Sequence, residues 1–393
     1  MKFSFKLSNL MNNKFLNKNI LIILKKSLVY LPCPSNLNIW WTFGSISGVC
    51  LVVQLVRGLI LAAHYEARIR GSFYRVAHII KEVNIGWFLR NCHVAGARLF
   101  FLCVYTHIGR RVYYGGYENY KVWFRGILML FLLIAIAFMG YVLPWGQISY
   151  WGCTVITNLF SAIPYLGKDL VLLLWGGPSI GDYTLKRFFL LHFFLPFLLL
   201  AISVLHLFFL HENGSRNPLG IRRNTNRVSF YPYYLWIDIC GITIIIIILI
   251  LLVLYDPLFL NVPDNWILAN ALVTPVHIKP EWYFLWLYAI LRSIPFKLGG
   301  IVTIVLAILF LYLLPFLRFS FKIKSFAFYP SGQILFWLWV CIILCLTWIG
   351  ACPVEYPFEF IGRLITFFYF IFYPLQCRIR FIWDKLLEKN LIN

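Results

Sequence analysis

Apolar residues gather in long runs along the chain of 393 residues, and the segments between these runs carry most of the charged residues. A helix that crosses a bilayer needs about 20 predominantly apolar residues. Eight runs approach this length, and they cover residues 40–63, 86–109, 124–144, 188–210, 238–255, 299–317, 333–350 and 358–377. The pattern predicts an all-α polytopic membrane protein with eight transmembrane helices, and the even number of spans places both termini on one side.

The composition excludes the other broad classes of protein. Hydrophobic residues make up 61% of the chain and charged residues 12%, whereas a soluble domain is about half apolar and about a quarter charged. Aromatic residues make up 19% of the chain, and disordered chains contain few of them. A membrane protein is the class that remains.

The basic charge of the chain is distributed unevenly over the predicted loops. There are 35 Lys and Arg against 14 Asp and Glu, a net charge of +21. Loops on the side of the termini hold 21 of the basic and five of the acidic residues, and the opposite loops hold 11 and nine. Because Lys and Arg concentrate in cytoplasmic loops, both termini are expected in the cytoplasm-equivalent compartment. The charge then serves orientation and contact with anionic lipid, cardiolipin being the expected one, rather than nucleic-acid binding.

Cysteine spacing removes several kinds of site. Ten Cys are scattered along the chain, and no C-x-x-C pair or C-x-x-C-H motif occurs. A zinc ribbon, a thioredoxin-like site and the usual covalent attachment of a c-type haem are therefore unsupported.

Four of the eight histidines lie inside two predicted spans, at equal intervals. His93 and His107 are in the second span, and His192 and His206 are in the fourth. Fourteen residues are nearly four helical turns, so each pair shares one helix face with about 21 Å between its members. These two spans run in the same direction because two crossings separate them, so His93 pairs with His192 and His107 with His206. A lone membrane His usually makes an interhelical hydrogen bond, but two stacked pairs predict two haems with axial His ligands.

Glycine repeats with the same interval in the two other spans of this region. Gly44 and Gly58 are 14 residues apart in the first span, and Gly126 and Gly140 are 14 apart in the third. Glycine lets a flat macrocycle approach the backbone closely, although small residues also serve helix packing in membranes. The shared interval favours haem edges in two layers.

Two arginines lie one turn from the ligand candidates. Arg90 precedes His93 and Arg110 follows His107 by three residues. Each is positioned to pair with haem propionates, and the alternative is an interfacial arginine that reaches toward water.

The segment Pro-Glu-Trp-Tyr at 280–283 places a carboxylate between two apolar stretches. Glu281 is therefore expected to be partly desolvated, which would suit it for proton transfer. A buried, hydrogen-bonded structural Glu is the alternative.

Together these features closely resemble the mitochondrial cytochrome b family, the di-haem subunit of ubiquinol–cytochrome c reductase (respiratory complex III). The resemblance covers about residues 30–380, and the matching stretches include NIGWFLRNCH (84–93), GYVLPWGQISYWG (140–152), HLFFLHENGSRNP (206–218) and HIKPEWYFLWLYAILRSIP (277–295). It implies two noncovalent b-type haems, with His93 and His192 as ligands of the low-potential haem and His107 and His206 of the high-potential haem.

The resemblance also implies two quinone sites that operate a Q-cycle. Glu281 would accept a proton at the outer quinol-oxidation site, which Tyr141, Gly152, Phe284 and Tyr288 would shape. The inner quinone-reduction site would use His211, Ser215 and Asp238, with Trp41 and Ser45 nearby. From position alone, Asp238 opens the fifth span and could equally cap it.

The implied partners are a c-type cytochrome subunit, a Rieske iron–sulfur protein and accessory subunits, in a homodimeric complex of the mitochondrial inner membrane with both termini on the matrix side.

Arg98 departs from the rest of the pattern, since it lies in the second span but points away from the haem face. It needs a partner subunit, a carboxylate or water.

The chain is expected to divide into four parts. Residues 1–39 form an N-terminal surface segment, 40–215 the di-haem four-helix bundle, 216–380 a C-terminal four-span domain with the quinol-oxidation loop, and 381–393 a polar tail.

Three alternative functions remain open: a chloroplast-type quinol–plastocyanin reductase subunit, a non-enzymatic transporter with a His relay, and a two-haem membrane anchor of a dehydrogenase.

Overall fold

The computed structural model describes residue 22 and residues 25–220, 226–317 and 325–392, most of them in helices. The longer helices are α2 (Phe43–Ala62), α4 (Gly86–Tyr113), α5 (Tyr120–Val142), α8 (Asp182–Asn213), α9 (Tyr233–Tyr255), α11 (Lys297–Leu313), α12 (Pro330–Ala351) and α13 (Phe358–Ile392). The shorter ones are α3 (Ile69–Lys81), α6 (Gln147–Leu159), α7 (Gly167–Trp175) and α10 (Trp282–Ser293). Two short strands, β1 (Pro32–Pro34) and β2 (Arg227–Ser229), pair antiparallel.

Each of the eight predicted spans coincides with one of the longer helices, which confirms an all-α polytopic membrane protein. Among the described residues, six helices are long and apolar enough to cross a membrane, namely α2 with the turn that precedes it, α5, α8, α9, α12 and α13. Two of the longer helices fall outside this group: α4, which carries four arginines and two histidines, and α11, which has only 17 residues.

Local sequence explains where several helices begin and end. Helix α12 starts with Pro330, whose missing N–H costs nothing in the first turn. Helix α8 is followed by Gly214 at a φ of 72°, a left-handed conformation that glycine adopts without strain. Inside α8, Pro196 leaves the His192 carbonyl without its usual helical hydrogen bond.

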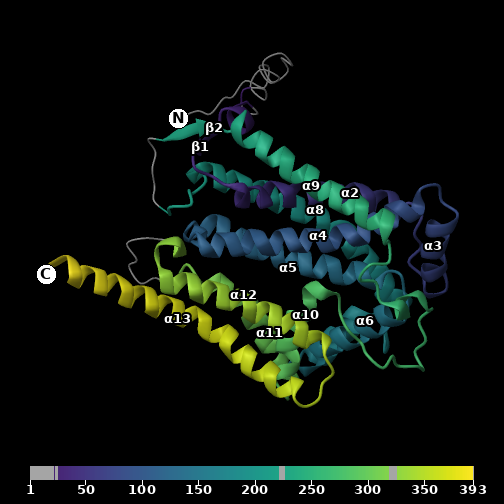
Figure 1. The fold of residues 1–393 in the computed structure, drawn as a ribbon. Coiled ribbons are helices and arrows are strands. Elements are labelled where there is room, and N and C mark those ends of the chain that lie inside the picture. The colour runs from purple at the N-terminus through teal and green to yellow at the C-terminus, as the bar shows by residue number, and fades with distance from the viewer. Residues whose placement is uncertain (1–21, 23–24, 221–225, 318–324, 393) are drawn as a thin grey trace, which may run out of the picture.

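The helices lie side by side with their ends at two opposite edges of the molecule (Figure 1). Helices α3 and α6 lie at one edge, and β1, β2 and the far end of α13 lie at the other, so the described chain starts and finishes at the same edge. Helix α5 packs on α8, α2 packs on α4, and α2 also contacts α8. These four helices form the predicted N-terminal bundle.

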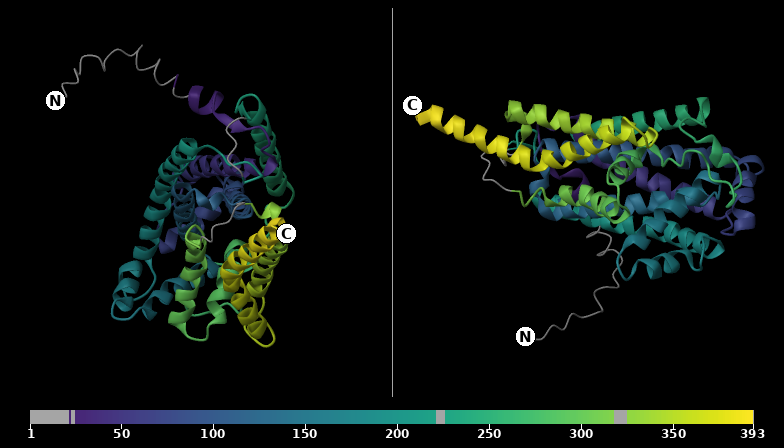
Figure 2. Two further views of the ribbon diagram at one scale, coloured as in Figure 1. Left: turned by 90° about the vertical axis from the view of Figure 1, so that its left-hand side faces the viewer. Right: turned by 90° about the horizontal axis from the view of Figure 1, so that it is seen from below.

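The C-terminal helices form a second group, with one difference from the predicted division. Helices α10, α11, α12 and α13 pack on one another, whereas α9 packs on α2 and α4. Helix α13 also continues through the predicted polar tail as far as Ile392 and extends past its neighbours (Figure 2). The predicted N-terminal surface helix lies mostly outside the described residues.

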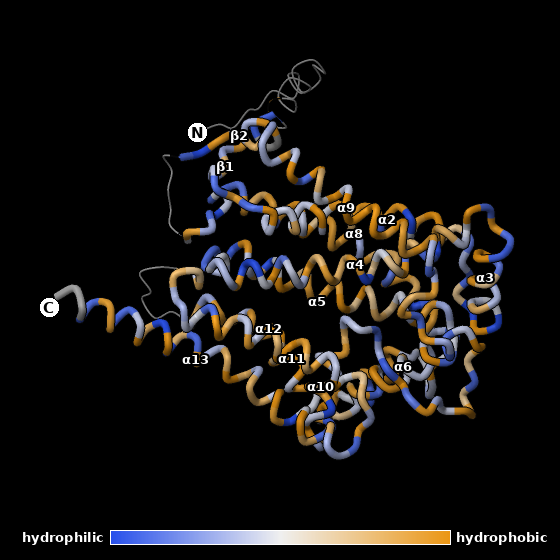
Figure 3. Tube along the Cα trace, viewed as in Figure 1, coloured by the Kyte–Doolittle hydropathy of each residue, from blue (hydrophilic) through white to orange (hydrophobic). Residues whose placement is uncertain are grey.

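The outside of the molecule matches a membrane environment. Apolar residues dominate the middle of the helices, and polar residues gather toward their ends and on α3 (Figure 3). Helix α9 exposes Ile244, Ile247 and Leu254, among other apolar residues. Such a surface is stable only against lipid or another protein.

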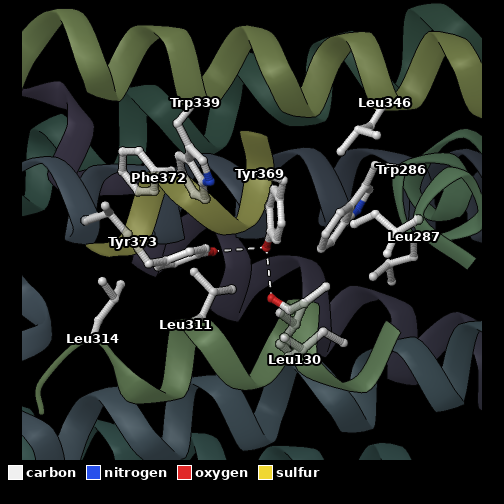
Figure 4. Packing of buried hydrophobic residues seen from close by; sticks show 14 of the residues in the cluster. Leu130, Trp286, Leu287, Leu311, Leu314, Trp339, Leu346, Tyr369, Phe372 and Tyr373 are labelled. Atoms are coloured by element: carbon white, nitrogen blue, oxygen red, sulfur yellow. Dashed lines mark hydrogen bonds between the residues drawn. The ribbon is translucent and has the colours of Figure 1, made fainter. Parts of the chain in front are cut away.

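The interior of the C-terminal group is filled by aromatic side chains (Figure 4). Trp339 of α12 stacks on Phe372 of α13 with ring centroids 5.1 Å apart. The hydroxyl of Tyr373 donates to that of Tyr369 at 3.0 Å, and Tyr369 donates to the Ala307 carbonyl at 2.8 Å. These contacts join α11, α12 and α13 into one packed core.

Candidate functional site

Each of the four bundle histidines lies directly against one of the four predicted glycines. A Cβ atom placed on Gly58 would lie 3.3 Å from Cε1 of His93, and one on Gly44 would lie 3.2 Å from Cε1 of His107. The two glycines of α2 and the two histidines of α4, both 14 residues apart, therefore contact each other in two separate pairs.

The same match joins α5 and α8. A Cβ on Gly126 would lie 3.4 Å from Cε1 of His206, and one on Gly140 would lie 2.8 Å from Nδ1 of His192. The four imidazoles therefore occupy two levels, each with one ring from α4 and one from α8.

The rings of His93 and His192 leave room for a metal between them. Their centroids are 6.3 Å apart and the rings are nearly perpendicular, at 82°. Two imidazole nitrogens, each about 2 Å from a shared metal with the ring centre about 1 Å behind, would place the centroids about 6 Å apart. Nδ1 of His192 lies 2.8 Å from the carbonyl oxygen of Ile136, so Nε2 is the nitrogen that remains for coordination.

Buried polar atoms and a cavity mark the same place. Within the described part of the chain, Nδ1 of His93 at this level, and Nδ1 of His107 at the other level, is buried without a hydrogen-bond partner, which native proteins rarely tolerate. A cavity of about 210 Å³ is lined by His93 and His192, by Gly58 and Gly140, and by mainly apolar side chains. An apolar cavity between two imidazoles and two glycines fits a flat, hydrophobic cofactor with axial His ligands.

Three further residues belong to this region, and sequence analysis had not assigned them to it. Gln54 donates to the carbonyl of His93 at 2.8 Å, and Arg57 donates to the carbonyl of Cys92 at 3.0 Å. Tyr65, in the loop after α2, lines the cavity and donates to the Leu143 carbonyl at 2.7 Å. Burial raises the pKa of Tyr65, so it stays a neutral donor. Polar residues within the first span were the signal for Gln54 and Arg57.

The two predicted propionate-binding arginines lie on aromatic rings. The guanidinium of Arg90 lies 5.1 Å from the ring centre of Trp266, and it lines the cavity. The guanidinium of Arg110 lies 4.8 Å from the ring centre of Trp41, and its Nε is buried without a hydrogen-bond partner in the described structure. Arg110 thus has a donor available to an acidic ligand group.

Glu281 is buried as predicted, but it is not isolated. Its carboxylate forms a two-pronged ion pair with Arg98, with Nη2 2.8 Å from Oε1 and Nε 3.0 Å from Oε2. The carboxylate is desolvated, and in addition a guanidinium lies against both of its oxygens. Of the partners considered for Arg98, the structure provides a carboxylate of the same chain.

The other outer-site candidates lie on three elements around Glu281. Tyr141 of α5 is close enough to interact electrostatically with Glu281 and Arg98. Phe284 donates its backbone N–H to the Glu281 carbonyl at 2.9 Å, and the ring of Tyr288 lies under Arg292. Gly152 of α6 faces open space, since a Cβ there would meet nothing within 4 Å.

Sequence profiles of known families match most of the chain. The profile described as cytochrome b/b6/petB matches residues 28–214, and the profile described as cytochrome b(C-terminal)/b6/petD matches residues 268–370. The chain belongs to the cytochrome b family. It is also similar to a chain of a solved structure named hyperthermophilic respiratory complex III, with 31% sequence identity and a TM-score of 0.87, over 94% of this chain and 98% of that one. This cytochrome b is thus a quinol-oxidoreductase membrane subunit of the b-haem type.

The predicted inner-site residues of this cytochrome b cluster only in part. The indole N–H of Trp41 donates to the Arg216 carbonyl at 3.0 Å, and the Asp238 carboxylate interacts with the hydroxyl of Ser45. His211 and Ser215 lie half-buried at the end of α8. In the described structure neither forms a side-chain hydrogen bond with the other three.

One structural expectation at this inner site is wrong. Helix α9 starts at Tyr233 with Pro232 at its N-cap, so Asp238 lies inside the helix and does not cap it. The predicted span started at residue 238 because the residues before it include tyrosines and a proline, which were not counted as part of the apolar run.

Proposed function

We propose that this chain is the di-haem subunit of a ubiquinol–cytochrome c reductase, working by a Q-cycle. The observation that carries the proposal is the one-to-one contact of four histidines with four glycines at two levels of the bundle. His93 and His192 would hold the low-potential haem iron, and His107 and His206 the high-potential one. Two b-type haems, when bound, relay electrons across the hydrocarbon layer over about 21 Å.

The residues around each haem would serve binding rather than chemistry. Gly44, Gly58, Gly126 and Gly140 would leave room for the macrocycle edges. Arg90 and Arg110 would pair with the propionates, which is consistent with the unpartnered Nε of Arg110.

At the outer level, Glu281 would accept a proton from quinol. Its oxygens lie buried beside α4 and α5, which limits competition from water. Tyr141, Gly152, Phe284 and Tyr288 would shape the pocket. At the inner level, His211, Ser215 and Asp238 would bind a quinone and deliver protons to it, with Trp41 and Ser45 alongside.

The assembly and location follow from the same reading. We propose a c-type cytochrome subunit, a Rieske iron–sulfur protein and accessory subunits as partners, in a homodimeric complex of the mitochondrial inner membrane that binds cardiolipin. The excess of basic residues in loops on the side of the termini supports a matrix location for both ends.

Difference spectra of the purified complex test the proposal. The reduced-minus-oxidised spectrum should show two noncovalent b-type haems per chain that titrate at different potentials, and ubiquinol should reduce them while cytochrome c is reduced. A single haem, or none, would overturn it.

The role of Glu281 has a separate test. Glu281→Gln should slow quinol oxidation by about 100-fold or more, because a general base contributes about that much, and should leave both haems bound. Loss of a haem would contradict the assigned role.

A further inference from the structure

Arg98 forms a buried ion pair with the proposed proton acceptor. The two side chains of Arg98 and Glu281 are 8% and 7% exposed. Two parallel N–H···O contacts, at 2.8 and 3.0 Å, join them. Paired bonds of this kind fix orientation as well as charge.

The same guanidinium binds the loop that follows α9. Nη1 donates to the carbonyl of Phe259 at 2.6 Å, and Nη2 donates to the carbonyl of Leu260 and to Oδ1 of Asn261, both at 3.0 Å. Every nitrogen of the guanidinium is thus engaged, and one side chain joins α4, the loop and Glu281.

The backbone of this loop supports a specific role for the contact. Leu260 has a φ of 63°, in the left-handed region where a bulky residue is rare and persists only if its surroundings hold it. The two carbonyls that flank this strained position are the two that accept from Arg98.

We propose that Arg98 is a positioning residue of the quinol-oxidation site, which supplies the hydrogen-bonded counter-charge of the Glu281 carboxylate, orients it and ties the 259–261 loop to it. This inference rests on the proposed role of Glu281. A carboxylate has about four lone-pair positions, of which Arg98 uses two, so others remain for a quinol hydroxyl. Only a proton moves in this step: one O–H bond of the quinol breaks, a Glu281 carboxylate oxygen takes the proton, and a quinol monoanion remains.

The contribution of Arg98 to the Glu281 carboxylate can be distinguished from that of the other charged and titratable groups nearby. Arg98 and Arg90 of α4, Tyr141 of α5 and Tyr283 of α10 are the charged and titratable groups that interact with this carboxylate. Among them Arg98 alone hydrogen-bonds to the carboxylate in the described residues. Without it the buried carboxylate loses its hydrogen-bonded counter-charge and keeps as a nearby cation only Arg90, which does not hydrogen-bond to it in the described structure, and burial favours the protonated form.

The test compares Arg98→Gln, Arg98→Lys and the wild type in the purified complex. Arg98→Gln should move the acid limb of the pH profile of kcat up by about one to three pH units, with both haems still visible in the spectrum. Arg98→Lys keeps the charge and should recover part of the shift. Infrared difference spectra should show a protonated-carboxyl band at neutral pH in Arg98→Gln that the wild type lacks.

Two further variants separate positioning from folding. The double variant Arg98→Gln/Glu281→Gln leaves no unpaired buried charge, so it should assemble, and it should lack the carboxyl band. Arg380 is another fully buried arginine, stacked on Phe326 and Tyr329 far from this site. Arg380→Gln should lower stability and leave the pH profile unchanged.

A pH profile of Arg98→Gln that matches the wild type, or the absence of the carboxyl band, would overturn the inference. Failure of the proposed function looks different, because the wild type would then show no quinol-dependent reduction of haem. The infrared band would still report on the pair in that case.

Discussion

The bundle of α2, α4, α5 and α8 and the group of α10 to α13 are both built mainly from apolar helices, yet their interiors differ in how they are filled. In the bundle, glycines lie against imidazoles, and a cavity of about 210 Å³ lies at the level of His93 and His192. In the C-terminal group, Trp339, Tyr369 and Phe372 fill the space between helices. Small residues at regular intervals thus keep an interior open for a ligand, and large aromatic residues close one.

Loss of one imidazole should give the largest difference between the two regions. His192→Leu should remove the proposed outer haem and nearly all of the proposed quinol–cytochrome c reductase activity, because the proposed axial ligand is gone. The C-terminal core should be unaffected. The spectrum and the steady-state rate measure both effects, with the exposed His64→Leu as control. Retention of two haems in His192→Leu would break the comparison.

Adding one methyl group to the open interior should come next. Gly140→Ala would place a Cβ against the ring of His192, which cannot retreat easily because its Nδ1 contacts the Ile136 carbonyl. The outer haem should be lost or shifted in potential. Gly126→Ala meets His206 only at 3.4 Å and should be milder, and Gly48→Ala meets nothing within 4 Å. Redox titration should rank the three variants in this order, and equal effects would show that the close approach has no role.

Removing a large aromatic side chain from the core of the C-terminal group should lower the stability of the protein without changing the haem potentials. Trp339→Ala leaves a cavity among the rings of α13 and should cost about 3–5 kcal/mol of stability. The midpoint of thermal inactivation should fall, while both haem potentials stay at their wild-type values. A changed potential would mean that the two regions are coupled.

The smallest effect is expected from Tyr369→Phe. This change removes one hydroxyl that donates to the Ala307 carbonyl and accepts from Tyr373, so two buried hydrogen bonds are lost. Each contributes about 1 kcal/mol, so the thermal midpoint should fall by less than in Trp339→Ala, with unchanged spectra. A fall as large as that of Trp339→Ala would contradict the ranking.

The spans could be predicted because each long apolar run has few other stable states in a membrane. The short helices α3, α6, α7 and α10 have only 13, 13, 9 and 12 residues, so none of them forms an apolar run long enough to be predicted as a span. Helix α9 also began five residues before its predicted start, which moved Asp238 from the end of the helix to its interior.

The candidate site was predictable where one helix carries a repeat. The 14-residue intervals place His and Gly on helix faces by helical geometry alone, and the structure brings them into contact. The Arg98–Glu281 pair joins residues 183 positions apart, and no local pattern specifies such a contact. The sequence indicated only that a buried arginine needs a partner.

Pro196 has a mechanical consequence for α8. Since it cannot donate to the carbonyl of His192, the two histidines of this helix belong to segments that are not joined by an unbroken ladder of hydrogen bonds. On α4 no proline lies between His93 and His107, so an unbroken helix fixes the spacing of these two histidines. A small reorientation of the His192 ring therefore need not move the His206 ring. Each histidine of α8 can adjust separately to the ligand at its own level.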